Sequence, residues 1–537
     1  MSTIKTDTGS SARSFLKGAA ILSLSMVAVK LCGVIYKVAL TNLYGTMGSE
    51  FAAFGSGIFG MTYELYVVLF TLATAGFPIA VSRLISESTA QGRYNDVRRI
   101  HNVSKPFFII TGLVFFVIMF FSSFIYVKLI ESPYALYPVM ALSPLTFFGC
   151  LVAIYRGYFE GMRNMAPTAV SEVIEAATKL IIGFTAAYIV TNNGIAEYNA
   201  SGTVFGMVFA NKTEAFRTLV SYSVTAAIAG ITLGSVFCFL FLILRFKFAK
   251  PIPQEYYRNS VDARSRKETF TRLVKTAVPI GLAALVMSVA GFIDQMVIQR
   301  VIYNTALTNP HELLAQFGGL MDTEIKFDAA GQVIEKDINI HTSLVGCYGN
   351  ALTIIHVITA LTQVFGTSAM PNVTNAFTRG NKGELKNAIE TVLRLTTIVT
   401  FPMGLGAFVL ADPIMNLLFN GSVAIIGANV LRVLGISVIF IGCSTPMCSM
   451  LQGIGKVSMP LKLFIVGMII KVIVNFSFVS IVQINIVGAA TGSLVAYVII
   501  DAAATYQLCK HSGVIPNFLA TVFKPLLGAI VCGVSAY

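Results

Sequence analysis

Long apolar runs, separated by short polar stretches, occupy this chain from residue 15 to its end. A membrane-crossing helix needs about 20 predominantly apolar residues, and thirteen of the runs reach that length. The pattern therefore predicts an all-helical, polytopic membrane protein. The predicted spans are residues 15–43, 55–85, 105–130, 135–157, 167–191, 219–245, 273–303, 346–377, 389–419, 423–451, 459–482, 486–509 and 517–537.

The amino-acid composition supports a membrane protein, and the distribution of charge argues against a nucleic-acid partner. Of the 537 residues, 55% are hydrophobic and 12% are charged, and the mean hydropathy is +0.77. The net charge of +13 could suggest nucleic acid, but the basic residues lie in alternate loops, which is a pattern of membrane topology. We therefore predict no nucleic-acid partner. The eight cysteines lie mostly within apolar runs and no pair of them has metal-ligand spacing with histidines nearby, so neither a metal nor a cofactor is predicted.

The loops differ in charge from one side of the membrane to the other. Lys and Arg cluster after the second, fourth and sixth spans, and the largest cluster runs from Arg245 to Lys275. The loop after the seventh span is acidic instead. Because cytoplasmic loops carry the excess of Lys and Arg, the sequence predicts a cytoplasmic N-terminus.

The two halves of the chain repeat each other. The segment 161–167 (GMRNMAP) resembles 453–460 (GIGKVSMP) at an offset of 292, and Gly33 matches Gly291 at an offset of 258. Six spans separate each element from its copy, which predicts two parallel six-helix bundles around a central cavity. The predicted domains are a disordered cytoplasmic tail (1–14), an N-terminal bundle (15–245), a basic cytoplasmic linker (246–272), a C-terminal bundle (273–510) with an acidic extracellular insertion (302–343), and one extra helix (511–537), with a fourteenth span left open.

Two lysines lie within the first span. Ser23, Lys30, Gly33 and Lys37 fall on one stripe of a helix. A charge near the bilayer centre costs roughly 2.5–3.5 kcal/mol, so two on one face indicate a wet cavity or buried partners. The alternative is that each lysine snorkels to an interface. We predict that this stripe, together with Arg300, binds the substrate.

A second set of polar residues is predicted to gate the outer side of the cavity. Glu64 and His356 are repeat mates at the offset of 292, and Lys37 maps onto Gln295 at the offset of 258, next to Asp294. We predict that a Lys37–Asp294 pair, together with Glu64–His356, closes this side. The alternative is that each acid pairs within its own half.

Three charged residues of the fifth span have helical spacing. Glu172, Glu175 and Lys179 stand three and four residues apart, which favours a local ion pair near the cytoplasmic end of the span. Lys179 maps onto Lys471 by the offset of 292.

Three motifs resemble those of a known family. Residues 25–33 (SMVAVKLCG), 76–87 (GFPIAVSRLISE) and 155–169 (YRGYFEGMRNMAPTA) are similar to the stage V sporulation protein B and MurJ-type branch of the multidrug/oligosaccharidyl-lipid/polysaccharide exporter superfamily. The likeness extends over nearly the whole chain. The second and third motifs contain Arg83, Arg156 and Glu160, which we predict to form a cytoplasmic gate.

The resemblance implies a flippase rather than an enzyme. It implies movement of undecaprenyl-diphosphate-linked peptidoglycan precursor (lipid II) across a bacterial cytoplasmic membrane by alternating access. It also implies fourteen spans, with a groove for the lipid tail in the last two, and contact between Lys30 and the diphosphate. Here Tyr36 and Glu64 stand where some relatives carry further cavity arginines, and Lys471 lies in the span that holds a sodium site in others.

Alternatives to lipid II transport come from three classes. The chain could export another polyprenyl-linked glycan, act as a cation-coupled multidrug antiporter, or serve as a non-transporting scaffold for cell-wall synthesis. The buried lysines disfavour the antiporter because they repel cationic drugs. The predicted partners are a lipid-linked oligosaccharide and membrane lipids, with cell-wall synthesis enzymes as further candidates.

Overall fold

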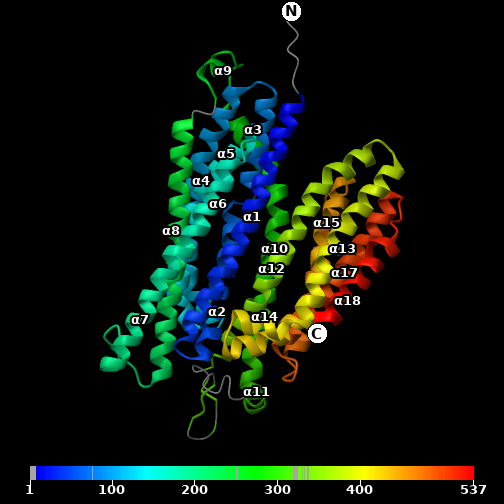
Figure 1. Ribbon diagram of the computed structural model, residues 1–537. Helices are drawn as coiled ribbons and strands as arrows, with labels where there is room; N and C mark the ends of the chain where they lie inside the picture. The colour runs from blue at the N-terminus through cyan, green and yellow to red at the C-terminus, as the bar shows by residue number, and fades with distance from the viewer. Residues whose placement is uncertain are drawn as a thin grey trace, which may run out of the picture.

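In the computed structural model the chain is a bundle of long helices (Figure 1). The structure describes residues 8–74, 76–249, 252–317, 325–328, 331, 333–334 and 338–536. The side chains of residues 8–23 lie outside this description, and so do residues 318–324, 329–330, 332 and 335–337 of the acidic insertion. The predicted all-helical, polytopic class is confirmed.

The first half of the chain runs from α1 to α8. Span two is divided at Gly76, which has a φ of 75°, and Pro78 then stands in the first turn of the next helix. The elements are α1 (Thr8–Gly45), α2 (Ser49–Thr74), α3 (Phe77–Ala90), α4 (Tyr94–Leu129), η1 (Pro133–Ala135), α5 (Leu136–Gly161), α6 (Ala166–Thr178), the π-helical turn η2 (Lys179–Gly183), α7 (Phe184–Ser201), the hairpin strands β1 (Thr203–Val204) and β2 (Met207–Val208), and α8 (Lys212–Ala249).

The second half begins after a short basic segment. Ser265 caps α10 by accepting a hydrogen bond from the backbone N–H of Glu268, and Asn381 caps α13 in the same way. The elements are α9 (Gln254–Arg258), α10 (Arg266–Thr308), α11 (Pro310–Phe317), α12 (Ile340–Thr378), α13 (Lys382–Val409), α14 (Ala411–Leu418), α15 (Gly421–Gly453), α16 (Met459–Val479), α17 (Ile486–Ser512), the π-helical turn η5 (Leu519–Phe523) and α18 (Lys524–Ala536).

Twelve helical segments among the described residues are long and apolar enough to cross a membrane. They match the first twelve predicted spans, while the thirteenth corresponds to a shorter apolar helix, Leu519–Ser535. Several helices run beyond their predicted ends. The 43 residues of α10 extend about 65 Å, roughly twice the apolar core of a bilayer, because the helix continues through charged residues that hydropathy excludes.

The packing differs between the two ends of the molecule, which we call the α9 end and the α11 end (Figure 1). Toward the α11 end one continuous apolar cluster joins helices of both halves, from Tyr36 on α1 to Ala490 on α17. Toward the α9 end there are two separate clusters. One lies in α3, α4, α5, α8 and the start of α10, and the other in α12, α13, α15 and α17. We call the helices of these two clusters the two groups of helices: α3, α4, α5, α8 and the start of α10 form one, and α12, α13, α15 and α17 form the other. The two groups meet at the α11 end and part toward the α9 end.

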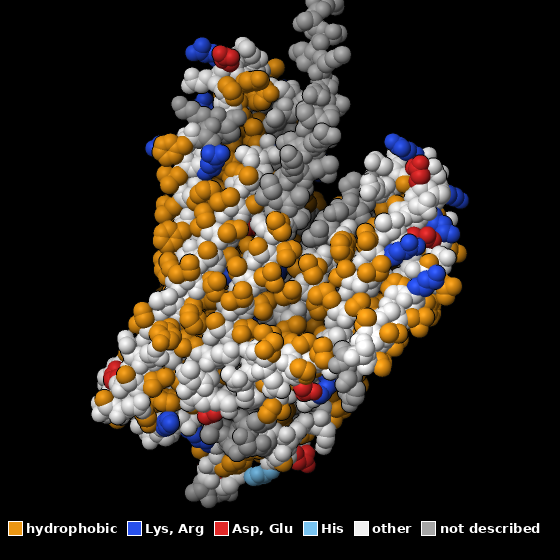
Figure 2. Space-filling view, viewed as in Figure 1, with side chains coloured by type: hydrophobic (Ala, Val, Ile, Leu, Met, Phe, Trp, Pro, Cys, Tyr) orange, Lys and Arg blue, Asp and Glu red, His pale blue; other side chains and the backbone are white. Residues whose placement is uncertain are grey.

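The surface agrees with a membrane position. On the face shown in Figure 2, charged side chains gather toward the ends and hydrophobic side chains cover the band between them. Large apolar side chains on α4 and α18 are exposed within that band, as lipid-facing helices require. Together with the twelve apolar segments, this establishes a multi-pass membrane protein.

Candidate functional site: a charged cavity between the two groups of helices

A cavity of about 460 Å³ lies between α1 and α2 on one side and α12 on the other. A second hollow of about 440 Å³ adjoins it and shares Lys30, Tyr63, Glu175 and Lys179 with it. The two groups of helices part toward the α9 end, where their apolar clusters are separate. The sequence predictions converge on this place, since the cavity lining includes Lys30, Gly33, Lys37, Glu64, Gln295 and His356.

The three lysines of the cavity come from two helical segments. Lys30 and Lys37 lie two turns apart on α1, and Lys179 begins the π-helical turn η2. A Cβ at Gly33 would lie 3.9 Å from the Lys179 Nζ, so this ammonium group reaches α1 between the other two lysines. Turns of the π type often occur at functional sites. The ammonium groups of all three lysines thus face one cavity.

Lys37 links the two groups of helices. Its Nζ donates a hydrogen bond of 2.5 Å to the carbonyl oxygen of Gly349 on α12. Lys30 is the more exposed of the two and makes no hydrogen bond or ion pair with the described part of the chain. Lys30 is therefore available to a ligand, whereas Lys37 already has a protein partner.

The carboxylates near the second hollow are held within the first half. Glu175 accepts a hydrogen bond of 3.0 Å from Arg156, and Glu172 accepts one of 3.2 Å from the Ser25 hydroxyl. The local Glu–Lys pair predicted for the fifth span is therefore wrong, because Glu175 pairs across to α5. This leaves Lys179 in the cavity lining, a position that its helical spacing did not indicate.

Asp294 lies outside the cavity. Only 5% of it is exposed, and its carboxylate pairs with the Lys471 Nζ at 2.8 Å and accepts a 2.5 Å hydrogen bond from the Asn475 amide. Both partners belong to α16. The Lys37–Asp294 pair predicted from the repeat offset is not formed, and Asp294 follows the alternative of pairing within its own half.

The remaining predicted residues are dispersed. Arg300 is 55% exposed at the α11 end of α10, where it pairs with Glu131 at 3.1 Å and stacks on Tyr303, so its predicted contact with the cavity substrate is not supported by its position. Arg83 lines a separate pocket at the α9 end. Among the described residues, no hydrogen bond or ion pair joins Arg83, Arg156 and Glu160, so the predicted gate is not assembled here. The side chain of Ser23 lies outside the described residues.

Close backbone contact seals the cavity at the α11 end. A Cβ at Gly57 on α2 would collide with the carbonyl oxygen of Thr342 on α12, and one at Gly346 on α12 would collide with that of Ala53 on α2. The Thr41 hydroxyl lies 2.8 Å from that of Ser56. Two glycines, one from each half, therefore let α2 and α12 cross in direct contact. Neither glycine stands out in the hydrophobic pattern or the repeat of the sequence.

Comparison with known proteins identifies related chains. The profile of the family described as "Polysaccharide biosynthesis protein" matches residues 15–377, and that of MatE matches residues 339–477. The lipid II flippase MurJ of Bacillus subtilis (strain 168) is 23% identical over 530 residues, which cover 96% of this chain and 87% of that protein. Stage V sporulation protein B of the same organism is 21% identical, covering 91% and 82%.

Solved structures show the same fold. A lipid II flippase MurJ in an inward closed conformation superposes with a TM-score of 0.61 at 15% identity and covers 96% of this chain and 92% of that one. An inward-facing multidrug resistance MATE family transporter of the MOP superfamily gives a TM-score of 0.60 at 15% identity, covering 91% and 99%. The fold is therefore that of the MOP-superfamily transporters.

Proposed function

This chain belongs to the polysaccharide biosynthesis protein family, and on that premise we propose that it is a flippase for a polyprenyl-diphosphate-linked precursor, namely lipid II. MurJ and stage V sporulation protein B are its relatives over most of its length, which supports a lipid-linked substrate. The membrane would be the bacterial cytoplasmic membrane, and transport would proceed by alternating access.

The observation that carries this proposal is the set of three lysines in one cavity. Lys30, Lys37 and Lys179 face a space between the two groups of helices. The diphosphate of such a precursor, esterified at both ends, is a dianion that ammonium groups bind through charge-assisted hydrogen bonds. The lining also holds the carboxylates of Glu64 and Glu175, and Glu175 is paired with Arg156, so cations remain in excess. A cationic drug would be repelled by this excess, which disfavours the antiporter function.

The two ends of the molecule correspond to the two sides of the membrane in the proposed transport cycle. We assign the α9 end to the cytoplasm because the basic loops lie there. The structure then represents a state that is closed toward the outside by the α2–α12 crossing and in which the two groups of helices part toward the cytoplasm. Substrate would enter from the inner leaflet and leave after the crossing opens.

The orientation predicts opposite labelling of two loops. In a cysteine-free background, Asn259→Cys near α9 should react with an impermeant maleimide only after the cells are permeabilised. Glu312→Cys on α11 should react in intact cells, since both positions are exposed and lie at opposite ends. Labelling of Asn259→Cys alone in intact cells would invert the topology.

The function is tested by replacement of a known flippase. In bacterial cells depleted of their own lipid II flippase, this chain should restore growth and should expose lipid II on the outer leaflet, as measured with an impermeant lipid II-modifying reagent. Ethidium efflux without rescue would support the antiporter. Rescue of a different polyprenyl-linked glycan alone would support another exporter, and a stable protein with neither effect would support the scaffold.

The close contact of α2 and α12 at Gly57 and Gly346 predicts that a larger side chain there impairs flipping. Gly346→Val should lower flipping at least about tenfold, because overpacking at a backbone contact costs roughly 1–3 kcal/mol and opposes the closed state. A reporter cysteine, Thr353→Cys in the cavity lining, should then react with maleimide from outside. Gly406→Val on α13 is the matched control, because nothing lies within 4 Å of its Cβ position and it does not line the cavity. Equal labelling of the reporter in both variants would show that the contact of α2 with α12 does not act as the outer gate.

A further inference from the structure

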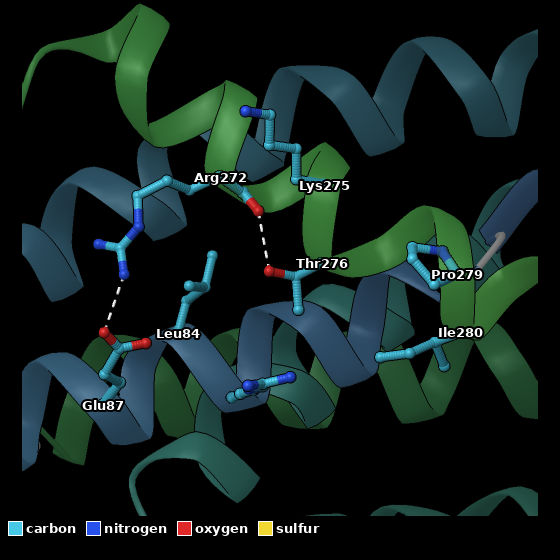
Figure 3. A pocket seen from close by; sticks show the side chains of 8 residues that line it. Leu84, Glu87, Arg272, Lys275, Thr276, Pro279 and Ile280 are labelled. Carbon is cyan, nitrogen blue, oxygen red and sulfur yellow. Dashed lines mark hydrogen bonds and ion pairs between the residues drawn. The ribbon is translucent and has the colours of Figure 1, made fainter. Parts of the chain in front are cut away.

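Another pocket, of about 410 Å³, lies at the α9 end between α3 and α10, apart from the central cavity and the hollow that adjoins it (Figure 3). Arg83 and Glu87 come from α3, and Arg272 and Lys275 come from the first turns of α10. Figure 3 shows Arg272 and Glu87 reaching toward each other across the pocket. The pocket shares no lining residue with the central cavity.

The pocket carries an excess of positive charge. Arg272 and Glu87 pair at 2.8 Å and so neutralise each other. Arg83 and Lys275 are both exposed, and neither makes a hydrogen bond or ion pair with any residue that the structure describes. Three cations against one carboxylate leave two positive charges without a partner.

The walls of the pocket are fixed relative to each other. A Cβ at Gly76, which precedes α3, would collide with the backbone of Gly281 and Ala277 on α10. The backbones of α3 and α10 are therefore in direct contact beside the pocket. This contact fixes the backbones that carry the cations of the two helices.

The pocket lies where the charged end of the molecule meets the apolar band. Leu84, Pro279 and Ile280 form its apolar side. Farther along the same helices, exposed side chains are apolar, with 57% of Ile79 and 55% of Leu282 exposed. Cations at this level of a membrane protein stand beside lipid phosphates, with acyl chains directly below them.

We propose that this pocket binds the phosphate of an anionic membrane phospholipid, with Arg83 and Lys275 as its ligands. Arg83 would hold the phosphate through its planar guanidinium and Lys275 through its ammonium, while an acyl chain would cover the apolar side. A free phosphate ion would leave that apolar side uncovered. The bound lipid would join α3 to α10, and so join the two sequence repeats at the cytoplasmic face. This site does not depend on which substrate occupies the central cavity.

The test measures lipid binding by the full chain in detergent with native mass spectrometry. Phosphatidylglycerol should be retained in preference to zwitterionic phosphatidylcholine. Arg83→Gln/Lys275→Gln should weaken phosphatidylglycerol binding about 30-fold, because each cation near a lipid phosphate contributes roughly a fivefold change in affinity. The charge-retaining variant Arg83→Lys/Lys275→Arg should bind as the unaltered chain does, which separates loss of charge from misfolding.

A matched control removes two other cations from the same end. Arg245→Gln/Lys247→Gln changes two exposed residues of α8 outside the pocket and should leave phosphatidylglycerol binding unchanged. Equal weakening in both double variants would reduce the effect to general charge and overturn the site. Displacement of phosphatidylglycerol by inorganic phosphate would assign the pocket to a free anion, and displacement by undecaprenyl diphosphate would assign it to the substrate path. Either result would contradict the proposal.

Discussion

Replacing Lys30 by alanine is expected to impair flipping severely while the protein still reaches the membrane. Lys30 is the exposed ammonium of the cavity and has no partner among the described residues, so its charge is available to a substrate diphosphate. A hydrogen bond to a charged group contributes roughly 1.5–3 kcal/mol, which corresponds to a loss of about 10- to 150-fold. Lys30→Glu should be more severe, because the carboxylate repels the diphosphate, and Lys30→Arg should retain part of the activity.

The measurement is transport of labelled lipid II by the purified chain in vesicles, normalised to the amount of reconstituted protein. Lys456→Ala is the matched control, since it removes an exposed lysine from the loop before α16, outside the cavity. Its activity should equal that of the unaltered chain. Full activity in Lys30→Ala would remove Lys30 from the substrate site, even if lipid II proved to be the substrate.

Several polar residues of the cavity lining could be predicted from the sequence, because helical periodicity fixes the face and the depth of a residue. Lys30 and Lys37 share one face of α1, and the repeat offset brought Glu64 and His356 to similar depth. The structure finds all four in the lining of one cavity. Their role in transport stays a prediction, tested by the variants above.

Periodicity could not identify the partner of a buried charge. The offset placed Asp294 near the depth of Lys37, but depth does not determine which neighbouring helix a side chain faces. The α10 helix turns Asp294 toward α16, where Lys471 and Asn475 satisfy its carboxylate. The same limit applies to Glu175, whose partner Arg156 is on another helix. Local spacing can propose only partners within one helix.

The Asp294–Lys471 pair predicts a large effect on stability. Lys471→Leu should destabilise the protein by roughly 3–5 kcal/mol, because it leaves a carboxylate buried without a countercharge. The double variant Asp294→Asn/Lys471→Met removes both charges and should recover most of that loss, since replacing a buried pair by neutral groups is often close to neutral. The measurement is the thermal unfolding midpoint in detergent. The exposed pair Arg432–Asp412 is the control, and Asp412→Asn should cost no more than about 1 kcal/mol.

Charge exchange then decides which lysine Asp294 requires. Asp294→Lys/Lys471→Asp should restore stability relative to either single variant, because the two side chains are 2.8 Å apart and the exchange preserves their attraction. Lys37→Asp/Asp294→Lys should not restore it, because it leaves two lysines adjacent at α10 and α16 and places a carboxylate opposite the Gly349 carbonyl. Rescue of flipping by this second exchange, but not by the first, would show that Asp294 acts across the cavity with Lys37. Rescue by the first alone would make Asp294 a structural residue of the second half, and would leave the cavity lysines without a fixed acidic partner on the facing helices.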